Sequence, residues 1–136
     1  MDRVVHFHIP VDDMKRARKF YESVFDWKIE ETGIGRNYHL VKTVDADEMG
    51  VPKEPGAING ALFMRDEYAK APSVVIAVDS IDEYIEKIEK KGGSVVLPKA
   101  PVEDFGMFAE ISDTEGNVIG LWETLMYCTE ESCGLK

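Results

Sequence analysis

An internal repeat constrains the fold of this 136-residue chain more than any other feature. Residues 9–13 read Ile-Pro-Val-Asp-Asp, and residues 76–80, which lie 67 positions later, read Ile-Ala-Val-Asp-Ser. A second match relates GAINGALF at 56–63 to GNVIGLWE at 116–123, at an offset of 60. The difference between the offsets places extra loop in the first copy, within the Pro-, Gly- and acid-rich segment 44–57. Since one such copy has too little core to be stable alone, the repeat predicts two units that pack together or exchange with a partner chain.

Hydrophobic periodicity predicts a strand, a helix and then three strands in the first copy. The strand at 3–9 leads to a helix for which Asp12 or Asp13 is the N-cap. The apolar residues that recur at helical spacing and are predicted to bury one face of this helix are Met14, Ala17, Phe20, Tyr21 and Val24. The strands that follow are predicted near 27–32, 36–43 and 58–64.

The second copy repeats this order of elements. A strand at 73–78 precedes a helix that begins at Ser80, and Glu83 three residues later completes a capping box. Its predicted buried stripe consists of Ile81, Ile85 and Ile88, and its end is marked by Lys90, Lys91 and Gly92. The remaining strands are predicted near 94–98, 106–112 and 117–124, with the turn DTEGN between the last two.

These elements predict an α+β protein with two tandem βαβββ modules, whose curved sheets form a cup with a pocket on its concave side. We expect a single domain over residues 1–136. Its predicted parts are module 1 at about 3–64, a linker at about 65–72, module 2 at about 73–126 and a C-terminal tail at 127–136.

The charge of the chain excludes several classes of partner. A formal net charge of −10 and a pI near 4.7 argue against nucleic acid and anionic membranes, whose binding depends on accumulated Lys and Arg. No apolar stretch approaches the ~20 residues of a membrane span, and no signal sequence opens the chain, so we expect a soluble, cytoplasmic protein. A local cationic cluster is interpreted as a solvated face; its members are Lys15, Arg16, Arg18, Lys19 and Lys28.

Two cysteines, Cys128 and Cys133, fall in the terminal stretch YCTEESCGLK. Their spacing does not match that of a zinc-binding motif, and no second pair completes four ligands. We interpret them as reduced thiols on the tail.

Two histidines in VVHFHIPVDD carry the strongest chemical signal. His6 and His8 lie two residues apart on a predicted strand, so both imidazoles should project from one face. With Glu123 from the last strand they could form a set of two His and one carboxylate for a metal. Alternatively, the histidines line a polar pocket, or a histidine beside a carboxylate acts as a general acid/base without metal.

The same segments resemble a known family. VVHFHIPVDDMKRARKFYESVFDW at 4–27 and DTEGNVIGLWE at 113–123, with the repeated plan between them, resemble the vicinal oxygen chelate superfamily. This superfamily includes glyoxalase I, the bleomycin and fosfomycin resistance proteins and the extradiol dioxygenases. The resemblance implies paired βαβββ modules, a cup-shaped mixed sheet around a small-molecule site, and a homodimer.

The resemblance also implies four ligand positions in members that use a divalent metal such as Zn, Ni, Fe or Mn. Carried onto this chain, they fall on His6, Phe63, Ser73 and Glu123. Phe63 and Ser73 are not normal ligands for such an ion, so the set is incomplete. His8 is the histidine nearby that could replace one of the missing ligands.

Further residues are candidates for the pocket. Tyr38 and His39 alternate on a strand, so only one of them can face the cup. Substrate-binding positions are predicted at His8, Tyr38, Asn59, Phe105 and Phe108, and catalytic positions at His6 and Glu123. Trp122, on the strand face opposite Glu123, is interpreted as core that packs against a helix.

The sequence therefore predicts a glyoxalase/bleomycin-resistance-like protein that binds a small organic molecule in its cup. The resemblance implies a lyase or isomerase. One alternative is a non-catalytic protein that sequesters a small molecule, and another is an iron-dependent extradiol-type dioxygenase.

Overall fold

The computed structural model describes residues 1–33, 37–48 and 50–125. Cys128 and Cys133 lie outside the described residues. The chain divides into two compact units: the first unit is Val4–Val75, and the second unit comprises Met1–Arg3 and the residues from Ile76 onward. Neither helix in the described part of the chain is long and apolar enough to cross a membrane.

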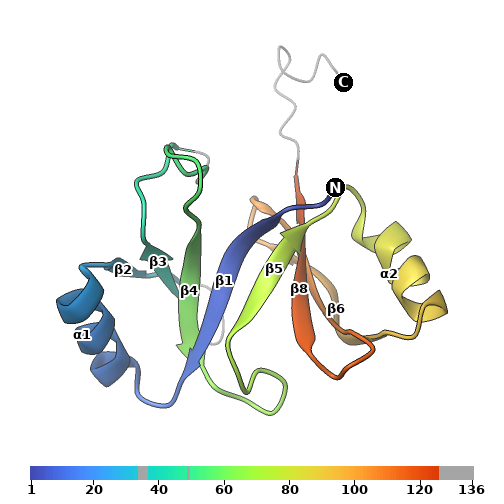
Figure 1. Cartoon of the computed structure of the whole chain (residues 1–136), viewed down its shortest axis with the longest axis horizontal. Helices are drawn as coiled ribbons and strands as arrows, with labels where there is room; N and C mark the ends of the chain where they lie inside the picture. Colours follow the sequence, from blue (N-terminus) through green and yellow to red (C-terminus); the bar gives the residue numbers. More distant parts are fainter. Residues whose placement is uncertain (34–36, 49, 126–136) are drawn as a thin grey trace. The chain divides into compact units, whose positions relative to one another are not determined.

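The first unit follows the predicted order of elements. It contains β1 (Val4–Val11), α1 (Met14–Phe25), β2 (Lys28–Glu31), β3 (His39–Lys42) and β4 (Asn59–Met64). The strands lie in the order β2-β3-β4-β1, with β1 parallel to β4 and the other neighbours antiparallel. α1 covers one face of this sheet (Figure 1).

The second unit repeats the plan, as predicted. β5 (Ser73–Ala77) begins in the first unit and ends in the second, which continues with α2 (Ile81–Lys90), β6 (Ser94–Val102), β7 (Gly106–Ser112) and β8 (Val118–Thr124). β8, β7 and β6 follow one another in the sheet as antiparallel neighbours. The α+β fold class with two βαβββ repeats is confirmed. The residue limits of the predicted modules and the cup between them stay predictions.

Side-chain caps define where both helices begin. Asp13 has extended backbone angles and accepts a hydrogen bond from the backbone N–H of Arg16 at 3.0 Å. Ser80 does the same for the N–H of Glu83 at 3.3 Å. Each cap satisfies a backbone donor that has no partner within the first turn of its helix. The predicted N-cap at Ser80 is therefore confirmed, and Asp13 is the N-cap of α1.

Each unit has its own apolar core between its helix and its sheet. The core of the first unit is formed by Val11, Met14, Ile29, Val41 and Leu62, with partly buried residues around them. The core of the second unit is formed by Val78, Ile81, Ala109, Ile111 and Leu121. The core residues of each strand occupy alternate positions, so the residues between them point to the face of the sheet that no helix of the unit covers. We call this opposite side the helix-free face.

The predicted buried stripe of α1 is partly wrong. Met14, Ala17 and Tyr21 pack in or against the core, but Phe20 is 53% exposed and Val24 is also exposed. Neighbouring residues on a helix are rotated by about 100°, so Phe20 lies at the edge of the stripe that contains Tyr21, and it is left uncovered. The exposed ring of Phe20 instead lies against the rings of Tyr21 and Phe25.

We predict that Leu62→Ala lowers the free energy of unfolding by about 2–5 kcal/mol, because Leu62 is 0% exposed in the core of the first unit and its loss leaves a cavity. The matched control is Leu40→Ala on the neighbouring strand. Leu40 is 37% exposed, so its truncation should cost below about 1 kcal/mol. Urea unfolding of both variants measures the difference, and equal losses would contradict this assignment of the core.

Candidate functional site

The register of β1 and β4 decides where the two histidines point. His6 lies beside Asn59, His8 beside Ala61 and Pro10 beside Phe63. The intervening residues of β1, such as Phe7 and Ile9, pack in the core beneath α1. His6 and His8 therefore share the helix-free face of the first unit, and their ring centroids lie 5.7 Å apart.

Tyr38 joins His8 on this face. The Tyr38 hydroxyl is hydrogen-bonded to Nε2 of His8. Its ring is stacked against Phe63, with centroids 6.1 Å apart, and Phe63 also lies edge-on to His8 at 5.3 Å. The choice between Tyr38 and His39 is thereby resolved: Tyr38 faces His8, whereas His39 lies on the side of α1 and contacts Arg18.

The two imidazoles of this face differ in their surroundings. His8 is 3% exposed and is enclosed by aromatic rings. Burial lowers the pKa of His6 from its ordinary 6.5 to about 4. His6 is consequently neutral at pH 7 and offers a lone pair to a hydrogen-bond donor.

Asn59 stands at the start of β4, beside His6. Its side-chain oxygen accepts hydrogen bonds from the backbone N–H groups of Thr43 at 2.8 Å and Val44 at 3.1 Å. The Asn59 side chain thus fixes the backbone of the segment that follows β3. A role in substrate binding stays a prediction for this residue.

Glu123 lies in the second unit, on the helix side of its sheet. Its Oε1 accepts a hydrogen bond from the backbone N–H of Ile81 at 2.8 Å, at the first residue of α2. Leu121, two residues before it, packs in the core with Ile81. The carboxylate therefore stabilises the start of α2, where the helix dipole favours negative charge.

The interpretation of Trp122 as core against a helix is wrong. Trp122 pairs with Phe108 in the β7–β8 ladder, and both alternate with residues of the helix-side core. Trp122 therefore lies on the helix-free face of the second unit, where its indole N–H donates to Oγ1 of Thr124 at 3.0 Å. Phe108 shares this face, while Phe105 precedes β7 and is exposed.

Glu110 is a candidate that sequence reasoning missed. It lies on β7 directly beside Gly120, on the same helix-free face as Phe108, and is only 2% exposed. Buried carboxylates are rare because burial of the charge is costly. The sequence feature that could have identified Glu110 is its position as the one charged residue in the otherwise mostly apolar strand GMFAEIS.

The predicted metal set is not assembled within either unit. His6 and His8 belong to the first unit and Glu123 to the second. Among the described residues no group of three His, Cys, Asp or Glu side chains could hold a metal ion. Phe63 is buried among aromatic rings and has no ligand atom. We therefore assign no chemical step to a metal.

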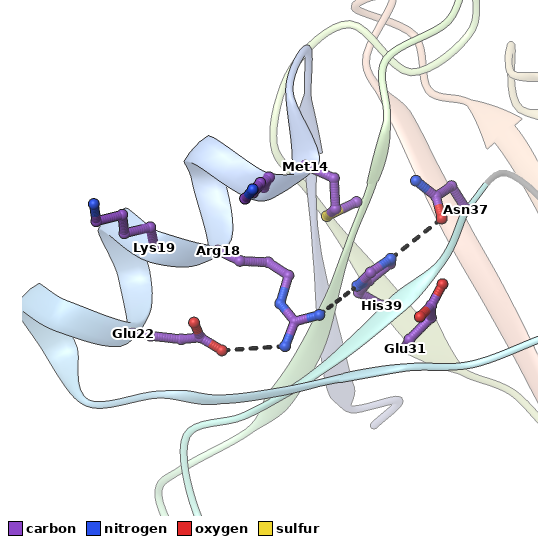
Figure 2. A pocket seen from close by; sticks show the side chains of 8 residues that line it. Met14, Arg18, Lys19, Glu22, Glu31, Asn37 and His39 are labelled. Carbon is purple, nitrogen blue, oxygen red and sulfur yellow. Dashed lines mark hydrogen bonds and ion pairs between the residues drawn. The ribbon is translucent and has the colours of Figure 1, made fainter.

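A groove lies on the helix side of the first unit, between α1 and the region around β2 and β3 (Figure 2). Its volume is about 460 Å³. The residues that line it are Met14, Lys15, Arg18, Lys19, Glu22, Glu31, Asn37 and His39. Burial lowers the pKa of His39, the nearby charge of Arg18 lowers it further, and Glu31 raises it.

We predict that the depressed pKa of His6 makes the fold sensitive to acid. The unfolded chain binds a proton near pH 6.5, whereas the folded chain binds it only near pH 4. Stability is complete above pH 6.5 and falls as the pH drops from 6.5 towards 4, by roughly 2–3 kcal/mol at pH 4.5. Urea unfolding at pH 7 and pH 4.5 measures this loss. His6→Gln should reduce the loss, and an unchanged pH dependence in this variant would refute the prediction.

Comparisons with known proteins identify the family. The model of the Glyoxalase/Bleomycin resistance protein/Dioxygenase superfamily matches residues 3–121. CFP32 of Mycobacterium bovis and of Mycobacterium tuberculosis, a glyoxylase by name, is 30% identical over 115 residues, which is 82% of this chain and 41% of the relative. The chain thus spans about two fifths of the length of these relatives. A glyoxylase-like domain-containing protein of Didymella fabae is 34% identical over 117 residues, 80% of this chain and 84% of that protein.

Solved structures show the same fold at low identity. Methylmalonyl-CoA epimerase from Mycobacterium tuberculosis matches with a TM-score of 0.64 and 17% identity, covering 90% of this chain and 88% of that one. Streptomyces coelicolor methylmalonyl-CoA epimerase in complex with 2-nitronate-propionyl-CoA matches with a TM-score of 0.68 and 15% identity, covering 93% and 97%. Because the family model matches residues 3–121 and the relative from Didymella fabae is 34% identical, the chain belongs to the Glyoxalase/Bleomycin resistance protein/Dioxygenase superfamily.

Proposed function

We propose that the protein binds a small organic molecule against the helix-free face of the first unit and catalyses a lyase- or isomerase-type proton transfer there. The observation that carries this proposal is the hydrogen bond between Tyr38 and His8. It lies on the side of the sheet that does not form the core beneath α1. A paired phenol and imidazole in such a place can hold or move a proton.

Tyr38 is the group of the pair that touches the ligand. It is half-buried, whereas His8 is buried behind it. If the hydroxyl donates to Nε2, the neutral His8 carries its proton on Nδ1. As Tyr38 takes a proton from the ligand, its own proton passes to Nε2, and the reverse transfer returns a proton to the ligand. His8 thus acts through Tyr38, and the neutral His6 offers a further acceptor on the same face.

The family context supports small-molecule chemistry of this kind. The curated relatives carry glyoxylase names, and two structural neighbours are epimerases, enzymes of the isomerase type. Removal of a proton and its return is one chemical route to epimerisation, and it is the task proposed for the Tyr38–His8 pair. The substrate itself is not carried over from any of these proteins.

Sequestration without catalysis is the second candidate function. His8 is 3% exposed and enclosed by Tyr38 and Phe63, an arrangement that also suits a rigid aromatic wall for an apolar ligand. No observation among the described residues favours the iron-dependent dioxygenase, because neither unit assembles three metal ligands. The predicted homodimer and the cytoplasmic location stay predictions.

We predict that Tyr38→Phe lowers turnover by about 100-fold or more while the ligand still binds, because the variant keeps the ring beside Phe63 and loses only the hydroxyl. Thermal-shift measurements with a methylglyoxal–glutathione adduct, methylmalonyl-CoA, catechol and bleomycin find a ligand, and product analysis then measures turnover. The matched control is Tyr68→Phe, which removes the hydroxyl of an exposed tyrosine of the same unit and should leave both properties unchanged.

The outcomes separate the candidate functions. Binding without turnover in the unmodified protein would favour sequestration. Turnover that survives Tyr38→Phe would exclude the assigned proton transfer. If a bound ligand perturbs the NMR signals of other surfaces but none from β1, β4 or Tyr38, the helix-free face of the first unit is not the binding site.

A further inference from the structure

Apart from the capping carboxylate of Asp13, the charges at the two ends of α1 oppose its helix dipole. The first turn of α1 has no acidic residue and carries Lys15 and Arg16, and its last turn has no basic residue. Cations near a helix N-terminus are unfavourable, because the backbone N–H groups there already carry partial positive charge. The repeat supplies an internal comparison, since α2 follows the favourable pattern with Asp82 and Glu83 in its first turn and Lys87 and Lys90 in its last.

The cations of α1 gather at the groove of the first unit. Lys15, Arg18 and Lys19 all line it, and Lys15 and Lys19 are one helical turn apart on the same side of α1. Like charges at this spacing repel each other. The dipole therefore opposes Lys15, and the spacing opposes the pair of Lys15 and Lys19. Packing does not account for the pair, because both lysines are exposed.

Arg18 is held in a fixed position at the groove. Its Nη2 donates to Glu22 at 3.3 Å, and its Nη1 lies 3.4 Å from Nδ1 of His39 (Figure 2). Nη2 also donates to the backbone oxygen of Ile29 at 2.8 Å. The ion pair also offsets the charge of Glu22. The positive charge at the groove is therefore supplied chiefly by the two exposed lysines.

Asn37 provides a directional donor on the opposite wall. Because Nδ1 of His39 accepts from Arg18, Nε2 carries the proton and donates to the side-chain oxygen of Asn37 at 3.2 Å. This contact fixes the orientation of the amide and leaves its nitrogen as a donor at the groove.

We propose that this groove binds a small organic molecule through an anionic group, a carboxylate or a phosphate. Lys15 and Lys19 supply positive charge that attracts the anion to the groove, and the amide nitrogen of Asn37 supplies a hydrogen bond. The groove, of about 460 Å³, is open to solvent, so it leaves room beside these groups for the organic part of such a ligand. Glu31, which also lines the groove, opposes the anion and limits its affinity.

This site is independent of the proposed function. It lies on the helix side of the first unit, whereas Tyr38 and His8 lie on the helix-free face. Either assignment can therefore fail without the other.

The test is an NMR titration of the ¹⁵N-labelled full chain with inorganic phosphate and, separately, with benzoate, at ionic strength held constant with sodium chloride. We expect saturable shifts of the Asn37 side-chain amide and of backbone signals in α1. The double variant Lys15→Gln/Lys19→Gln should bind about tenfold more weakly, as expected for the loss of two charge interactions. Glu31→Gln should bind more tightly.

The matched control is the double variant Arg16→Gln/Lys28→Gln. It removes two exposed cations of the same unit that do not line the groove, so it changes the net charge equally. It should bind within about twofold of the unmodified chain. Equal weakening of both double variants would show a general charge effect and overturn the proposal, as would the absence of saturable shifts with both anions. Tighter binding of phosphate or of benzoate identifies the anionic group.

Discussion

The alternation of side chains along β1 is the constraint on which the chemistry of the first unit depends. Phe7 and Ile9 face α1 and build the core, so His6 and His8 must face the other way. The parallel pairing with β4 then brings Phe63 to the same face, and the antiparallel β3–β4 pairing brings Tyr38. One register thus fixes both the core and the polar cluster, and a slip by one residue would exchange them.

Much of the fold follows from the sequence because its signals are local and periodic. The order of elements and the cap at Ser80 rest on hydrophobic period and on side-chain hydrogen bonds within one helical turn. Phe20 shows the limit of that approach: whether an apolar residue at the edge of a helical stripe is covered depends on how far the sheet extends beneath it. Helical spacing does not contain that information.

Sequence comparison alone also misaligns the last strands of the two repeats. The sequence offset of 60 equates Phe63 with Glu123, yet Phe63 lies on a helix-free face and Glu123 on a helix side. In the structure, Leu62 and Leu121 are equivalent, since each packs in the core beneath its own helix, and Phe63 then corresponds to Trp122. Because side chains alternate with a period of two, an error of one residue reverses every facing assignment on the strand. Pairing partners are needed to correct it.

The corrected repeat separates what the fold requires from what it does not. Both copies keep a helix cap and an apolar core, which a stable βαβββ unit needs whatever it binds. The two copies also differ at positions where the stability of the fold does not require a difference. His8 of the first copy corresponds to the buried apolar Val75 of the second. The charges in the first and last turns of α1 are the reverse of those in α2. A second copy that folds without these features shows that the fold does not demand them. Residues that depart from local rules without a structural need are where function is expected, and in the first unit they fall on opposite sides of one sheet.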